Sequence, residues 1–246
     1  MKKKVLLKIT VGIAAFLLIL AILFMANSFL GNPVSAKVAK GKALAYINDK
    51  YGHLNLEIKK VTYNPKNGSY LISVTSSTSI DTHFFLSYRD GEIFRDDYEV
   101  SVLSGMNTMD RFRDQYKKSL TPLVQAKIND VTNLSVIPEK LTKYDFELDS
   151  AFDKKLVENV NIVIRCTGGT DAKHLSEILK TTCDVMKENG YAAAKFGITS
   201  QHETVLTELR NIKPAHIESE SLEEILQQAI TNTEYDGITA FSKSHK

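Results

Sequence analysis

Residues 54–74 read LNLEIKKVTYNPKNGSYLISV, and this stretch has the pattern of a β-hairpin. Apolar residues alternate from Leu54 to Ile58 and resume in the opposite phase at Val61. Because strand side chains alternate between faces, this change of phase predicts a bulge at Lys59-Lys60. Asn67-Gly68 is the strongest turn signal in the stretch. The return strand follows with alternating Tyr70, Ile72 and Val74.

The elements on either side of this hairpin complete a first α+β domain over residues 34–128. A helix precedes it, beginning near Pro33 and ending at Gly52 as the C′ residue. Two strands follow at residues 83–88 and 93–100, and then a helix with Asn107 as its cap, which Pro122 should kink or end. Adjacent Asp96 and Asp97 point to opposite faces of the second of these strands and therefore cannot share a proton.

The pattern restarts after residue 130 and predicts a second α+β domain over residues 131–235. It contains a short strand at 134–137, a possible strand at 144–148 and a central strand at 160–166. A helix then runs to about residue 189, followed by paired strands at 191–199 and 204–212. A last helix starts at Ser221, where Ser-Leu-Glu-Glu matches a capping box, and residues 236–246 form a frayed tail. The fold class is α+β, with each domain an antiparallel or mixed sheet packed by helices.

The N-terminus predicts the compartment. Residues 1–9 form a basic segment, and residues 10–30 form an apolar helix. The twenty residues from Val11 to Leu30 would reach about 30 Å, the thickness of a bilayer core. We interpret them as a single membrane span with a cytoplasmic N-terminus and extracytoplasmic domains. One alternative is a signal peptide cleaved after Val34-Ser35-Ala36, and another is a buried soluble helix.

Composition argues against a nucleic-acid partner. The formal charge is +2, but four lysines precede the apolar run, which leaves 31 − 4 = 27 basic against 29 acidic residues. The remaining chain has no block of basic residues, and phosphate binding needs clustered cations.

Motif searches predict no catalytic residue, no cofactor and no metal. Gly168-Gly169 lies between a strand and a helix but lacks P-loop or G-x-G-x-x-G spacing, so it reads as a tight turn with Thr170 or Asp171 capping the helix. The six histidines lack metal-ligand spacing, and neither G-x-S-x-G nor S-x-x-K occurs. Cys166 and Cys183 read as small buried residues, with a disulfide between them as the alternative.

One candidate for a recognition surface is the Ser/Thr-rich patch before the third strand. A polar patch beside a histidine can form hydrogen bonds with a ligand, although a strand end with exposed hydroxyls has the same composition. Its members are Thr78, Ser79, Asp81, Thr82 and His83.

The order of these segments resembles the YfjL-like proteins of Gram-positive bacteria. The most specific pieces are Gly31-Asn-Pro33 after the apolar run, the Tyr63-Asn-Pro-Lys-x-Gly68 turn and Asp97-Tyr98. The resemblance implies a small membrane-anchored protein without an assigned activity, and it supplies no catalytic residue. The helix followed by an antiparallel sheet also resembles cystatin-like or PepSY-like modules, by fold analogy alone.

We therefore expect a cell-membrane protein that acts by binding rather than as an enzyme, with an envelope protein or peptide as its partner. One alternative is an envelope enzyme with a site between the two domains. Another is a passive structural component of the envelope.

Overall fold

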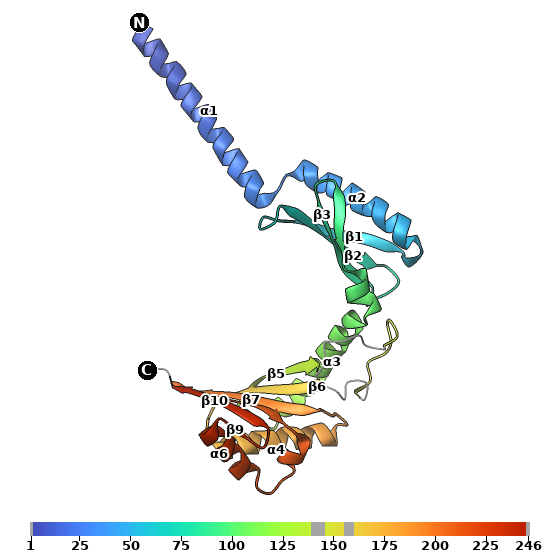
Figure 1. Ribbon diagram of the computed structural model, residues 1–246, viewed down its shortest axis with the longest axis vertical. Coiled ribbons are helices and arrows are strands. Elements are labelled where there is room, and N and C mark those ends of the chain that lie inside the picture. The colour runs from blue at the N-terminus through green and yellow to red at the C-terminus, as the bar shows by residue number, and fades with distance from the viewer. Residues whose placement is uncertain (1, 139–145, 155–159, 245–246) are drawn as a thin grey trace. The chain divides into compact units, whose positions relative to one another are not determined.

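The computed structural model describes residues 2–138, 146–154 and 160–244 (Figure 1). The chain divides into two compact units. The first comprises residues 1–107 with 145–149, and the second comprises residues 108–144 with 150–246. Both contain one β-sheet packed by helices, which confirms the predicted α+β class. The predicted domain boundary at residues 128–131 follows α3 (Met106–Gln125), whereas the division between the units falls near the start of this helix.

Helix α1 (Lys2–Leu30) carries the apolar run. Its described side chains from Val11 to Leu30 are largely exposed on all sides of the helix. Measured by length and hydropathy together, no helix qualifies as a membrane span among the residues that the structure describes.

The first unit contains an antiparallel meander in the order β1-β2-β3-β4. The strands are β1 (Leu56–Asn64), β2 (Ser69–Ser76), β3 (His83–Arg89) and β4 (Glu92–Asp96). The register of β1 against β2 shifts between Ile58 and Lys60, which confirms the predicted bulge. Tyr70, Ile72 and Val74 pair with Tyr88, Leu86 and Phe84 across the sheet, so one face of the two central strands is apolar.

Helix α2 (Pro33–Tyr51) covers that apolar face. Ala39, Ala43, Ile47 and Tyr51 recur every fourth residue and are buried against the sheet, as the amphipathic pattern of a surface helix requires. The core of the first unit lies between this stripe and strands β2 and β3.

Several local predictions for residues 34–128 are wrong. Gly52 is right-handed at φ −55°, and a 3₁₀ turn, η1 (Gly52–Leu54), continues α2 before Asn55 adopts the left-handed conformation. The fourth strand stops at Asp96 rather than at residue 100, because the chain turns into a π-helical segment, η2 (Glu99–Leu103). Asn107 lies inside α3, and the helix runs past Pro122 to Gln125, so it does not end at this proline.

The second unit contains a mixed sheet in the order β5-β6-β7-β8-β10-β9. Its strands are β5 (Val131–Pro138), β6 (Val160–Cys166), β7 (Lys195–His202), β8 (Val205–Ile212), β9 (Glu234–Tyr235) and β10 (Ile238–Ser244). Strands β6 and β7 are parallel, and the other pairs are antiparallel. A parallel pair needs a crossover, which α4 (Ala172–Glu188) provides.

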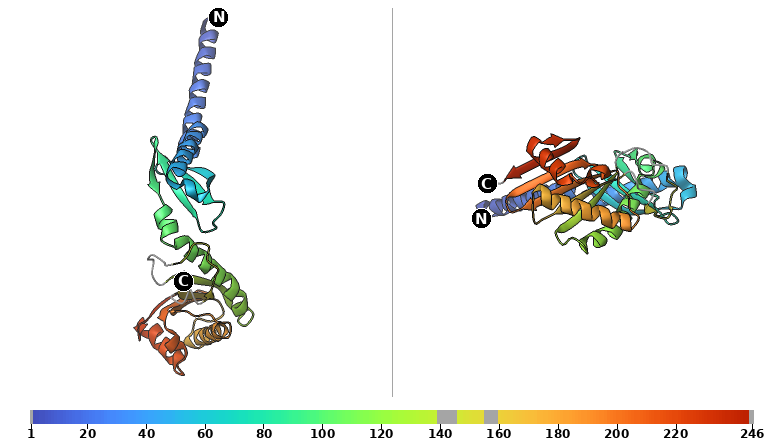
Figure 2. Two further views of the ribbon diagram at one scale, coloured as in Figure 1. Left: turned by 90° about the vertical axis from the view of Figure 1, so that its right-hand side faces the viewer. Right: turned by 90° about the horizontal axis from the view of Figure 1, so that it is seen from below.

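Helices α4 and α6 (Leu222–Asn232) pack together on one side of this sheet (Figure 1). A four-residue helix, α5 (Pro214–Ile217), precedes α6. Two further views show the layering within each unit (Figure 2). The fully buried residues of this core include Ile162, Ile164, Leu175, Leu179, Ile198, Leu209 and Leu226.

Three further predictions fail in residues 131–246. Phe146 and Leu148 are not in a strand, and Tyr144 lies outside the described residues. Ser221 is the N-cap of α6, but its side chain makes no capping hydrogen bond. The predicted tail at 236–246 instead contributes β10, because Asp236 and Gly237 both have positive φ and form a tight turn from β9.

Candidate functional site

The junction between α1 and the first unit is held by the β1–β2 hairpin. Gly31 has φ +74°, and a Cβ at this position would lie 2.5 Å from Cγ of Tyr63. Tyr70 Oη accepts a hydrogen bond from the Asn32 amide and donates one to the Asn32 carbonyl, each at 3.0 Å. The Asn32 side chain caps α2 by accepting from the Val34 amide at 2.8 Å. The two most specific sequence motifs, Gly-Asn-Pro and the tyrosine turn, thus contact each other.

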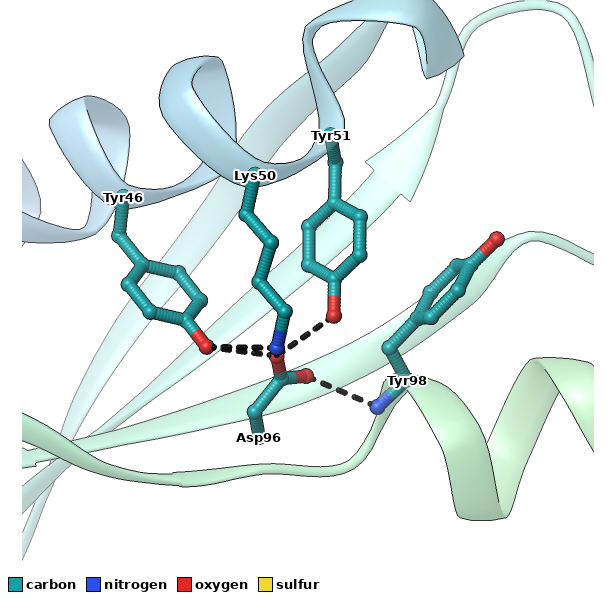
Figure 3. Close-up of polar contacts among 5 residues, drawn as sticks. All are labelled: Tyr46, Lys50, Tyr51, Asp96 and Tyr98. Atoms are coloured by element: carbon teal, nitrogen blue, oxygen red, sulfur yellow. Dashed lines mark hydrogen bonds and ion pairs between the residues drawn. The ribbon is translucent and has the colours of Figure 1, made fainter.

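A polar cluster fastens the end of α2 to β4 (Figure 3). Asp96 Oδ2 accepts hydrogen bonds from Tyr46 Oη at 2.9 Å, Lys50 Nζ at 2.9 Å and Tyr51 Oη at 2.7 Å. Its other oxygen, Oδ1, accepts from the Tyr98 amide at 2.9 Å. The Asp96 side chain is 13% exposed and that of Lys50 is 50% exposed, so the cluster opens to solvent on the lysine side. We call these five residues the Asp96 cluster.

The charge states of the Asp96 cluster follow from these contacts. Burial alone would raise the pKa of Asp96, but the hydrogen bonds from Lys50 and Tyr51 outweigh it and hold the pKa below its usual value. The hydrogen bond to Asp96 raises the pKa of Lys50. Burial, followed by the hydrogen bond to Asp96, raises the pKa of Tyr51 to about 12. At neutral pH the carboxylate and ammonium are therefore charged and Tyr51 is protonated.

Such a cluster is poorly suited to acid–base chemistry. A general acid or base works best with a pKa near the working pH, whereas these three groups are shifted away from neutrality. Both Asp96 oxygens already accept hydrogen bonds within the protein. The geometry instead supports a structural role, because it joins a helix and a strand that are 45 residues apart in sequence.

The predicted recognition residues form a loop that is partly buried. Asp81 and Thr82 are buried, whereas Thr78 and His83 are exposed. Ser79 Oγ lies 2.7 Å from Thr82 Oγ1 and 3.0 Å from Asp149 Oδ1. The structure thus brings Ser79, Asp81 and Thr82 together as an internally bonded turn. Their role in recognition stays a prediction.

The same loop is closed by reciprocal contacts with neighbouring segments. Asp149 Oδ1 accepts from the Asp81 amide at 2.9 Å, and Asp81 Oδ2 accepts from the Asp149 amide at 3.0 Å. Asn107 Nδ2 donates to the Asp81 and His83 carbonyls at 2.8 and 2.6 Å. The Asn107 side chain, expected to cap a helix, therefore ties α3 to this loop.

The Gly168-Gly169 turn in the second unit has a packing role. Asp171 caps α4 by accepting from the His174 amide at 3.0 Å, as predicted for this residue. His174 Nε2 lies 3.0 Å from the Thr167 carbonyl and 3.7 Å from Asp130 Oδ2. Carboxylates at Asp130 and Asp171 make this helix terminus unfavourable for an anion.

The described part of the chain shows neither a reactive cysteine nor a group of metal ligands. Cys166 and Cys183 are both free and buried. Burial raises the pKa of each thiol, which disfavours the reactive thiolate. Over residues 2–138, 146–154 and 160–244, no three His, Cys, Asp or Glu side chains are grouped to hold a metal ion.

Sequence reasoning did not find the Asp96 cluster. Tyr46 and Lys50 are four residues apart and therefore share one helix face, where Lys50 Nζ also donates to Tyr46 Oη at 3.0 Å. This spacing was the available sequence signal. The acceptor, Asp96, lies on a strand whose pairing with the helix has no local sequence pattern.

The fold and these contacts define a protein in which two small α+β domains follow an apolar N-terminal helix in the sequence. Family models for the YfjL-like N-terminal domain and the YfjL-like C-terminal domain match residues 6–97 and 115–227. The chain therefore belongs to the YfjL-like family.

The other comparisons add little. No curated protein matches the chain. It is similar to the crystal structure of a DUF5037 family protein from Ruminococcus gnavus at 14% identity, over 83% of this chain and 90% of that one, with a TM-score of 0.25. A score this low carries no argument, and nothing in the comparisons supports the cystatin-like analogy.

Proposed function

We propose that this protein is anchored in the cell membrane by α1 and acts outside the cytoplasm by binding an envelope protein or peptide. The observation that carries the anchor is the exposure of apolar side chains around α1. Phe16, Leu18, Phe24 and Leu30 are each more than half exposed. An all-round apolar helix needs an apolar environment, and a bilayer supplies one. Since no described helix meets the criterion of a span, the anchor remains a proposal.

The contacts between the residues after α1 and the β1–β2 hairpin support the proposal, because they connect the proposed anchor to the first unit in a fixed conformation. Gly31 packs against Tyr63, and Asn32 is hydrogen bonded on both sides of its peptide unit by Tyr70. A free linker would need neither contact. Lysines before the apolar run favour a cytoplasmic N-terminus, which places both domains outside.

The binding part of the proposal is supported by an open sheet edge. Strand β9 pairs with β10 only at Ile238 and Thr239 in the described chain, and the Ala240 amide donates to the Thr233 carbonyl. Backbone groups of alternate residues face the same side, so Ser242 presents its N–H and C=O to the unpaired side. An extended peptide can add a strand there.

Anchoring is tested by fractionating cells that make the full chain and washing the membranes with alkaline carbonate. We expect the protein to stay in the pellet and an extracellular protease to degrade both domains in intact, wall-stripped cells. Recovery in the soluble or medium fraction would refute the anchor. N-terminal sequencing that began at Lys37 would show cleavage of the segment instead.

Binding is tested by photo-crosslinking in the membrane. A benzophenone amino acid at Phe241, an exposed position beside the open edge, should capture a partner. The same group at exposed Phe94 in the first unit is the control. Ser242→Pro removes one donor from the open side and should abolish the adduct without breaking the ladder to β8. An adduct that survives Ser242→Pro, or equal capture from Phe94, would contradict strand addition at β10.

A further inference from the structure

The first unit contains a shallow groove between the first half of α2 and the bulged part of β1. Its volume is about 280 Å³. The lining combines an apolar floor with lysines at the rim. We call it the lysine groove, and its residues are Ala36, Lys37, Lys40, Ile58, Lys59, Lys60 and Val61.

The bulge explains why successive residues of β1 reach this groove. In a regular strand, neighbouring side chains point to opposite faces, so Lys59 and Lys60 would separate. The register shift between Ile58 and Lys60 inserts one extra residue. The groove therefore receives both lysines together with Ile58 and Val61.

The charge of the lysine groove is strongly positive. Four lysines line it, and all four are exposed. Lys59 pairs with Glu57 at 2.5 Å. Counting that carboxylate against the four lysines leaves a net charge of 4 − 1 = +3 at this surface. Such a surface complements a phosphate group, and the apolar floor suits a ligand that also carries hydrocarbon.

The groove lies close in sequence to the end of α1. Leu30 and Val34 are 79% and 71% exposed, so apolar surface continues from the end of α1 into the start of α2. Lys37 follows Leu30 by only seven residues, which span at most about 25 Å even when fully extended. The headgroup layer on one side of a bilayer is roughly 5–8 Å thick. A lysine side chain can extend back across that distance.

From these observations we infer that the lysine groove binds the phosphate of an anionic phospholipid in the membrane that holds α1. The lysine ammonium groups contact the phosphate, and Ala36, Ile58 and Val61 contact the glycerol and the first acyl carbons. This binding fixes the first unit against the membrane surface. The inference rests on the proposed anchor, since it is α1 that brings the groove to the lipid.

The test is native mass spectrometry of the full chain released from detergent with equal phosphatidylglycerol and phosphatidylcholine. We expect the wild type to retain phosphatidylglycerol preferentially. Each lysine near an anionic surface strengthens binding roughly fivefold. A triple charge reversal in the groove should therefore lower that retention by roughly a hundredfold or more. The groove variant is K37E/K40E/K60E, and the matched control is K118E/K127E/K173E in the second unit, which should behave as wild type.

The outcomes are separable. Equal retention of the two lipids, or equal loss in the groove and control variants, overturns the inference. A groove-dependent mass adduct with inorganic phosphate but none with phosphatidylglycerol overturns the lipid as the ligand. K37Q/K40Q/K60Q, checked for native hydrogen exchange in α2, guards against misfolding and should also lose the preference. Carbonate extraction reports on the anchor separately, because α1 should hold all these variants in membranes.

Discussion

Replacing Asp96 with Asn should destabilise the first unit. Asn keeps the shape of the side chain but removes its charge, and one of its two polar atoms becomes a donor. Oδ2 of Asp96 accepts three hydrogen bonds and Oδ1 accepts a fourth, so an NH₂ group at either position faces another donor. Tyr51 is only 7% exposed, and water does not readily replace the acceptor it loses.

The expected loss of unfolding free energy is about 2–3 kcal/mol, because a hydrogen bond to a charged group contributes roughly 1.5–3 kcal/mol. Lys50 adds little to this figure, since its side chain is half exposed and regains water. For a domain of this size the loss lowers the melting temperature by roughly 8–24 °C. Asp90→Asn is the matched control. Asp90 is 87% exposed and pairs with Arg89 at 3.3 Å, so its replacement should cost under about 0.5 kcal/mol.

The pH dependence gives the sharper test. The pKa of Asp96 is lowered from 3.8 in the folded protein. Its stabilisation is therefore fully present above the unfolded pKa and is lost as the pH falls through the lower folded pKa. The difference in unfolding free energy between wild type and Asp96→Asn should be largest near neutral pH and smaller below pH 3.8. Native-state hydrogen exchange of the α2 amides in urea measures this difference for the first unit alone. A gap that stayed constant from neutral to acidic pH would refute the carboxylate as its source.

Three other substitutions follow from the same contacts. Gly31→Ala should lower the free energy of unfolding by more than about 1–2 kcal/mol, which is the cost of the left-handed backbone alone. Adding Tyr63→Ala should remove the clash with the new Cβ but not this backbone cost, and melting curves of the single and double variants check both effects. Tyr70→Phe removes the hydroxyl that binds Asn32 and should cost about 1–2 kcal/mol, measured by urea unfolding with Tyr88→Phe as the control. Asp171→Ala removes the cap of α4 and should cost about 1 kcal/mol in the second unit only. Its effect should fade at acidic pH, because the hydrogen bond from the His174 amide lowers the pKa of Asp171; exchange of α4 amides measures this.

Local patterns in the sequence predicted the elements that local physics controls. The phase change in residues 54–61 predicted the bulge because the period of a strand is two residues. Asp171 was among the predicted caps for the analogous reason, that a short acceptor before a helix satisfies an amide of its first turn. The Asp236-Gly237 turn carried an equally strong signal. It was missed because the short strand β9 before it has only two residues.

Features set by distant residues were not accessible in this way. Asn107 has the composition of a cap, yet its amide binds two carbonyls of a loop 24–26 residues away. Likewise, Asp96 is the last residue of β4 and Asp97 lies beyond the strand, so the predicted alternation between the two does not apply, and nothing local placed Asp96 opposite Tyr51. Both cases involve a polar side chain whose partner is chosen by tertiary packing. A buried polar group must be paired, so the sequence predicts that a partner exists and the fold determines which residue it is.

That distinction bears on the proposed function. Asp96, Asp81 and Asn107 each bind other residues of the same protein, so their contacts stabilise the fold without requiring a ligand. The lysine groove differs, because four cations gather at one surface with a single carboxylate beside them. Like charges brought together repel, which costs stability unless an anion binds. The bulge that adds a second lysine also lies on an edge strand, where it hinders pairing with another chain, and the same lysines are neutralised where the surface meets phosphate at the membrane.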